Sequence, residues 1–101
     1  MVLITSKDRA FLRSLANTIT PIFQLGKNGV EEAFLKQIED ALEAREIIKL
    51  TVLENSGYTA REASNEICEA IGCEGVQAIG NKVVLYKASK KNPKIKLPGQ
   101  K

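Results

Sequence analysis

The first apolar residues of the chain recur at the spacing of an α-helix. Five of them fall on one side of such a helix: Phe11, Leu12, Leu15, Ala16 and Ile19. The Thr5 hydroxyl can cap the first turn, and the Asp8 carboxylate can bond back to the capping residue. We therefore expect a helix from about residue 6 to residue 18, which Pro21 ends.

Two more helices are predicted from the same spacing. A second apolar stripe extends to about Arg45 and consists of Val30, Phe34, Ile38, Ala41 and Leu42. Thr59 can cap a third helix. The inward side of that helix carries Ala60, Ala63, Ile67 and Ile71. Its outward side is acidic, with Glu62, Glu66 and Glu69.

Four short stretches between and after these helices have the pattern of β-strands. They cover residues 22–25, 47–53, 76–79 and 83–87. In the second stretch, alternation places Ile48, Leu50 and Val52 on one apolar face. The last two stretches are separated by Gly80 and Asn81, which both tolerate positive φ and so predict a tight hairpin.

The expected order of elements is α-β-α-β-α-β-β, which indicates an α/β fold with a four-stranded mixed sheet. Strands separated by helices favour right-handed parallel crossovers, whereas the final hairpin pairs antiparallel. A length of 101 residues with 44% hydrophobic and 27% charged residues is typical of one compact globular domain. We assign residues 1–88 to this domain and residues 89–101 to a basic, extended C-terminal tail.

The composition excludes several kinds of chemistry. The chain has no histidine and two cysteines, so the usual four-ligand zinc site and every histidine-assisted nucleophile are excluded. We expect no enzyme activity, metal, cofactor or small-molecule substrate. Cys68 and Cys73 are interpreted as buried small apolar residues in a reducing compartment. No apolar run approaches the ~20 residues that span a bilayer, so we expect a cytoplasmic protein that does not contact membranes.

Charge is distributed unevenly along the chain. The net charge is +3, but residues 1–86 carry −3 and residues 87–101 carry +6. Such asymmetry favours an anionic partner such as a nucleic acid. The tail lysines that could contact it are Lys90, Lys91, Lys94 and Lys96. A solvated tail that only aids solubility remains the alternative.

The segment Gly26-Lys27-Asn28-Gly29 is a GxxG loop that opens the second helix. Glycines let the backbone approach a phosphate closely, and amides at a helix N-terminus donate to anions. The alternative is a plain strand-to-helix turn. A second GxxG segment, Gly72–Gly75, follows a helix and contains an acid, so it is interpreted as a helix C-cap and turn.

A polar stripe lies opposite the apolar side of the first helix. Arg9, Arg13 and Asn17 stand four residues apart and would share one face, which can follow a phosphate backbone. An ordinary solvated face is the alternative. The acidic side of the third helix would repel a polyanion, so a nucleic acid should bind away from it.

Nine blocks of the chain together resemble the CRM domain, the YhbY-like family. They are Leu12–Ala16, Pro21, Gly26–Val30, Ala41–Glu43, Glu46–Leu50, Val76–Gln77, Ile79–Gly80, Leu85–Lys87 and Ile95–Pro98. The resemblance implies an RNA-binding fold similar to the C-terminal domain of translation initiation factor three. It places the basic loop of the family on Gly26, Lys27, Asn28 and Gly29 and an arginine of its first helix on Arg13. The chain departs from the family at Asn17 and Thr20, where the family usually has histidine and lysine.

The resemblance implies a non-enzymatic protein that binds structured ribosomal RNA during assembly of the large ribosomal subunit. Its RNA contacts would come from the GxxG loop and the basic face of the first helix, and we expect a monomer. The alternative is a protein-interaction module that docks on an assembly factor or a ribosomal protein without touching RNA.

Overall fold

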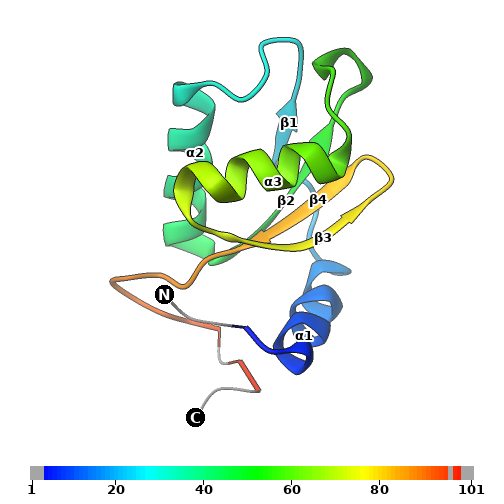
Figure 1. Ribbon diagram of the computed structural model, residues 1–101. Coiled ribbons are helices and arrows are strands. Elements are labelled where there is room, and N and C mark those ends of the chain that lie inside the picture. The colour runs from blue at the N-terminus through cyan, green and yellow to red at the C-terminus, as the bar shows by residue number, and fades with distance from the viewer. Residues whose placement is uncertain (1–3, 96, 99–101) are drawn as a thin grey trace.

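In the computed structural model, which describes residues 4–95 and 97–98, three α-helices pack against a four-stranded mixed sheet (Figure 1). The elements are α1 (Ser6–Ala16), β1 (Phe23–Leu25), α2 (Glu32–Arg45), β2 (Ile47–Val52), the 3-10 turn η1 (Glu54–Ser56), α3 (Ala60–Ile71), β3 (Glu74–Ile79) and β4 (Lys82–Tyr86). The expected α/β fold, its order of elements and its mixed sheet are confirmed.

The strands lie in the order β1-β2-β4-β3. β1 pairs parallel to β2, with Phe23 opposite Leu50, and helix α2 forms the crossover between them. β4 pairs antiparallel to both β2 and β3. The last strand of the chain therefore occupies a central position between two earlier strands.

Local capping explains where two of the helices begin. Thr5 and Asp8 form the expected capping box at α1, and Thr59 and Glu62 form an equivalent box at α3. Helix α1 ends at Ala16, two residues earlier than expected. The amides beyond it turn back to carbonyls three residues earlier, which tightens the chain before Pro21.

The two faces of the sheet bury two separate apolar clusters. Helices α2 and α3 cover one face, where Leu42 and Ile67 pack with strand residues such as Ile48 and Leu85. Helix α1 packs on the opposite face, against Ile47, Val76, Val84 and Tyr86. Because α1 covers only one end of this second face, part of the face is left open. Phe11, expected on the apolar side of α1, is 36% exposed and lies outside the cluster under this helix.

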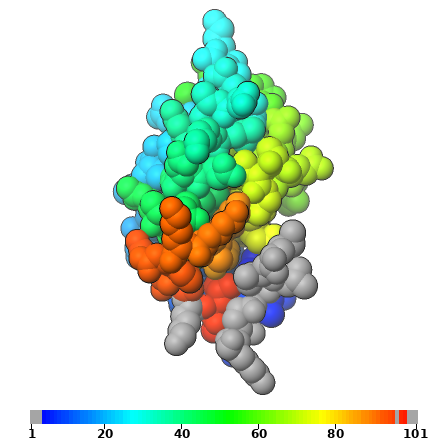
Figure 2. Space-filling view, turned by 90° about the vertical axis from the view of Figure 1, so that its left-hand side faces the viewer, coloured from blue at the N-terminus to red at the C-terminus, as the bar shows by residue number. Residues whose placement is uncertain are grey.

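The chain after β4 folds back onto the domain. Figure 2 shows this segment, in orange, lying on the surface beside the end of α2. The Glu46 carboxylate accepts the backbone amides of Ser89, Lys94 and Ile95, and the Glu43 carboxylate accepts those of Lys90 and Lys91. Leu97 is buried in the cluster under α1. These contacts attach the described part of the segment to both layers of the fold.

Candidate nucleic-acid interface

The GxxG loop lies at the carboxyl end of β1 and leads into α2. The Gly29 amide donates to the Gly26 carbonyl at 3.0 Å, which closes a tight turn. Lys27 and Asn28 occupy the tip of the turn and are exposed. A hollow of about 320 Å³ lies against the loop, and Glu31 also lines it. The loop therefore offers the exposed Lys27 and Asn28 side chains to a phosphate, with the Glu31 carboxylate nearby.

Packing behind the loop holds its shape. The Phe23 ring of β1 meets the Phe34 ring of α2 edge to face, with 6.4 Å between the ring centroids. Gly29 has a φ of 72°, and a Cβ at this position would lie 3.6 Å from the Tyr58 ring. That distance is an ordinary van der Waals contact, so it is the left-handed backbone conformation of the turn that favours glycine at this position.

The stripe expected on α1 is divided between two roles. Arg9 is half-buried, and its guanidinium donates to the Gly75 carbonyl of β3. Arg13 is exposed one turn later, and Asn17 is the exposed C-cap residue of the helix. Arg9 therefore helps attach α1 to the edge of the sheet, whereas Arg13 and Asn17 are open to a ligand.

A third arginine joins this area from a different helix. Arg61 of α3 lines the same hollow of about 470 Å³ as Arg9 and Arg13, and we call this hollow the arginine hollow. It lies along the edge strand β3, where α1 and α3 approach from opposite faces of the sheet. Sequence reasoning missed Arg61 because the acidic side of α3 dominates that helix. Only the tertiary fold brings the other side of α3 beside α1.

The loop and the α1 stripe are not neighbours. Figure 1 shows the loop after β1 at the upper end of the molecule and α1 at the lower end. The sheet register explains this separation. Helix α1 packs on Ile47 at the start of β2, whereas the loop leaves β1 where Leu25 pairs with Val52 at the end of β2.

Two cross-strand rows of side chains lie between these ends, on the part of the sheet that α1 leaves uncovered. The register places the first row on the same face as Val84, which contacts α1. The first row joins Lys49 and Gln77 across the buried Val84, which packs under α1, and the second consists of Gln24, Thr51, Lys82 and Ile79. We call the six accessible residues, without Val84, the open sheet face.

The open sheet face suits a polyanion by its charge. It carries the ammonium groups of Lys49 and Lys82 and no acidic residue. Ile79 is 63% exposed and adds an apolar contact surface. Sequence reasoning did not select either lysine. Strand alternation could have placed Lys49 on the face of β2 opposite its apolar residues. The pattern does not show, however, how much of the face that carries Lys49 is covered by α1.

The tail lysines are placed near the ends of α2 and α3. Lys90, Lys91 and Lys94 are exposed, and their backbone amides are held by Glu43 and Glu46. The Lys94 ammonium also donates to the Ala44 carbonyl at 3.0 Å. Lys96 lies outside the described residues. The described tail lysines therefore project from a fixed segment at the same end of the molecule as α1.

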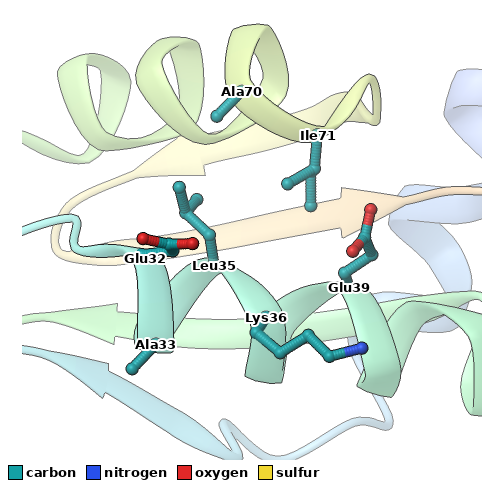
Figure 3. A pocket seen from close by; sticks show the side chains of 7 residues that line it. All are labelled: Glu32, Ala33, Leu35, Lys36, Glu39, Ala70 and Ile71. Atoms are coloured by element: carbon teal, nitrogen blue, oxygen red, sulfur yellow. The ribbon is translucent and has the colours of Figure 1, made fainter.

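A different hollow, of about 670 Å³, separates α2 from α3. Figure 3 shows Leu35 of α2 and Ile71 of α3 pointing toward one another across it. Glu32, Lys36 and Glu39 line the same hollow. Two carboxylates against one ammonium make this hollow a poor site for RNA.

Neither a metal cluster nor a membrane span is found within the described parts of the chain. No group of three or more Cys, Asp or Glu residues in residues 4–95 and 97–98 is arranged to hold a metal ion. No helix in this part of the chain is long and apolar enough to cross a bilayer.

Comparison with known proteins identifies relatives over nearly the whole chain. The model of the CRS1/YhbY (CRM) domain family matches residues 4–87. The probable RNA-binding protein YqeI of Bacillus subtilis is 49% identical, over 95% of this chain and 100% of that protein. An RNA-binding protein of Haemophilus influenzae is 37% identical, over 97% of this chain and 98% of its own length. The solution structure of the hypothetical protein SAV1595 from Staphylococcus aureus has a TM-score of 0.72 and 42% identity, covering 95% of this chain and 100% of that chain.

Proposed function

The chain belongs to the CRS1/YhbY (CRM) domain family, and from this premise we propose that it binds structured ribosomal RNA during assembly of the large ribosomal subunit. Two relatives that align over nearly the full chain carry the name of RNA-binding proteins. We propose a binding role without catalysis, performed by a monomer.

One observation supports the RNA-binding part most directly. Two groups suited to phosphate, the GxxG loop and the exposed stripe residues Arg13 and Asn17, flank the open sheet face with its two lysines. A ribose-phosphate backbone that crosses this face would meet cations at both ends and in the middle. Most nucleic-acid affinity comes from such phosphate contacts.

The chemistry of the surface favours folded RNA over separate bases. The open sheet face carries no aromatic side chain on which a base could stack. A-form RNA instead presents phosphates and 2′-hydroxyl groups in a wide, shallow minor groove. Lysine, glutamine and threonine side chains can contact those groups, and the lysines of the tail add charge at the α1 end.

The assembly role predicts how the protein sediments. In a sucrose gradient of cell lysate at moderate salt, the wild-type chain should peak near or just before the large subunit. The double variant Lys27→Glu with Arg13→Glu should move to the top of the gradient, because both ends of the surface then repel phosphate. Lys36→Glu is the matched control, since Lys36 is exposed in the hollow between α2 and α3.

The hollow between α2 and α3 favours a second candidate function, a protein-interaction module. Its apolar floor of Leu35 and Ile71 could receive a side chain of an assembly factor or ribosomal protein. In that case the double variant should still sediment with ribosomal particles, and Lys36→Glu should release the protein. Sedimentation of the wild-type chain with polysomes, or with no particle at all, would contradict the assembly role.

A further inference from the structure

The two cysteines of the chain face each other where α3 turns into β3. Helix α3 ends at Ile71, and the next residue, Gly72, caps it with a φ of 71° and an amide that donates to the Cys68 carbonyl at 2.9 Å. This left-handed turn reverses the chain within four residues and returns Cys73 to the side of the helix that carries Cys68. The two Sγ atoms are 3.4 Å apart, and both thiols are free.

A close approach of backbone to helix holds this pair in place. Gly75 lies directly beneath α3, where a Cβ would be 2.5 Å from the Ser64 Oγ and 3.6 Å from the Cys68 Sγ. The Gly75 carbonyl in turn accepts the Arg9 guanidinium. The first residues of β3 therefore lie close against α3, which keeps the backbone of Cys73 beside the helix that carries Cys68.

The two thiols differ in access to solvent. Cys68 is half-buried and lines the arginine hollow, with the side chains of Arg9, Arg13 and Arg61 around it. Cys73 also borders this hollow, but it is only 5% exposed and packs in the apolar cluster under α2 and α3. A reagent from solution can thus reach Cys68 first, and three arginines against the single carboxylate of Glu74 favour a reagent that carries carboxylates.

The electrostatic surroundings assign different roles to the two sulfur atoms. The hydrogen bond donated by the Cys73 thiol lowers the pKa of Cys68, and the nearby Arg9 charge lowers it as well. Burial and the Glu74 charge raise this pKa, but the lowering effects are larger. The same hydrogen bond and burial raise the pKa of Cys73. Cys68 is therefore the sulfur that carries negative charge more readily, and Cys73 is the sulfur that retains its proton.

We propose that Cys68 and Cys73 are a modification site, a dithiol that a low-molecular-weight disulfide such as glutathione disulfide oxidises to an intramolecular disulfide. The Cys68 thiolate attacks one sulfur of the reagent, which breaks the reagent S–S bond and releases one thiolate. Cys73 then loses its proton to that thiolate and attacks the Cys68 sulfur, which releases the second half of the reagent as a thiolate that takes its proton from water. The protein is oxidised by two electrons, and the reagent is reduced to two thiols.

Closing the bond requires little movement of the backbone. An S–S bond is ~2.05 Å long, so each sulfur must move less than 1 Å from its place in the reduced protein. The oxidation requires no RNA, so its test does not depend on the proposed RNA-binding function.

The test is thiol counting on the purified full-length chain treated with glutathione disulfide. Samples are quenched by alkylation at successive times and measured by intact mass. Wild-type protein should lose both thiols together and retain no glutathione. Cys73→Ser should stop at the mixed disulfide on Cys68, and Cys68→Ser should react more than about tenfold slower, because its remaining thiol is buried and protonated.

Two results would overturn the proposal. One is wild-type protein that accumulates the mixed disulfide without closing the bond. The other is a folded wild-type chain whose thiols react no faster than those of the same chain in denaturant. Since both results come from the wild-type protein, the decision does not depend on whether either serine variant folds.

Discussion

At the residue scale, Glu46 has the least ordinary position in the described chain. It has a φ of 67° although it is not glycine, and it is 1% exposed although it is an acid. The Glu46 amide donates the last hydrogen bond of α2, to the Leu42 carbonyl, and the Glu46 carbonyl accepts the Lys87 amide. One residue thus reverses the chain from α2 into β2, and its carboxylate collects three amides of the segment after β4.

We predict that Glu46→Gln lowers the free energy of unfolding by about 2 kcal/mol. The substitution replaces one accepting oxygen by an NH₂ group, which then faces a backbone N–H, and hydrogen bonds to a charged group contribute roughly 1.5 to 3 kcal/mol. Chemical denaturation measures the change. Glu39→Gln, on the exposed side of α2, is the control and should change stability by less than ~0.5 kcal/mol.

If Glu46→Gln, like the control, lowered the free energy of unfolding by less than about 0.5 kcal/mol, the segment after β4 would be held by its apolar contacts alone. From the sequence, Glu46 is noted only as the first residue of the segment Glu46–Leu50 that resembles the family, and its buried role is not predicted. Its role depends on residues more than 40 positions later in the chain, and such pairings leave no local signal.

At the scale of elements, the attachment of the segment after β4 is sensitive to acid. Hydrogen bonds from the Ser89 hydroxyl and the Lys90 amide lower the pKa of Glu43 from 4.5 to about 2. Only the ionised carboxylate accepts all of these bonds. The contribution of Glu43 is therefore complete above pH 4.5 and is lost as the pH falls from 4.5 through about 2.

The loss of the Glu43 hydrogen bonds at low pH can be followed at individual residues. In an NMR titration, the amide signals of Lys90 and Lys91 should shift with a midpoint near pH 2, because they report the carboxylate that accepts them. In Glu43→Gln the shift over this range should disappear. A midpoint near 4.5 in the wild-type chain would show that the carboxylate is free in solution.

Elements whose signals are local could be predicted from sequence. The caps at Thr5 and Thr59, the apolar stripes of three helices and the hairpin at Gly80 all depend on residues within a few positions of one another. Strand β3 begins two residues before the expected start at Val76, because its first residues pair with β4 across a register shift. Pairing partners decide such boundaries, and the pattern of β3 alone does not contain them.

At the scale of the whole molecule, the two ends of the proposed RNA surface should act independently. The chain measures 42 × 26 × 21 Å along its principal axes, and the GxxG loop and α1 lie at opposite ends in Figure 1. Substitutions that share no partner usually have additive free energies. We therefore predict that the fold-losses in RNA affinity from Lys27→Glu and Arg13→Glu multiply in the double variant.

The measurement is a salt titration of binding to structured RNA. Each lost phosphate contact should reduce the slope by roughly 0.7 to 0.9, while thermal unfolding stays near that of the wild-type chain because both side chains are exposed. Lys36→Glu is again the control for net charge. If either single variant removes all binding, the two ends are not separate contacts and the RNA occupies only one of them.

The candidate surface could be predicted only in pieces. The loop and the stripe of α1 are each visible as short patterns, and both are largely exposed as expected. That Lys49 and Lys82 lie between them, and that Arg61 joins Arg9 and Arg13, depends on strand order and on which helix covers which face. Those are properties of packing, and the periodicity of a single element does not contain them.

The central position of β4 has a consequence for how the chain is made. During synthesis β1, β2 and β3 leave the ribosome before β4, yet β2 and β3 are joined only through β4. A nascent chain that ends before Lys82 therefore exposes an unpaired edge of β2 and lacks the β4 residues of both apolar clusters. The sheet therefore cannot form cooperatively until β4 has emerged, and a chain truncated before Lys82 should be degraded rather than accumulate.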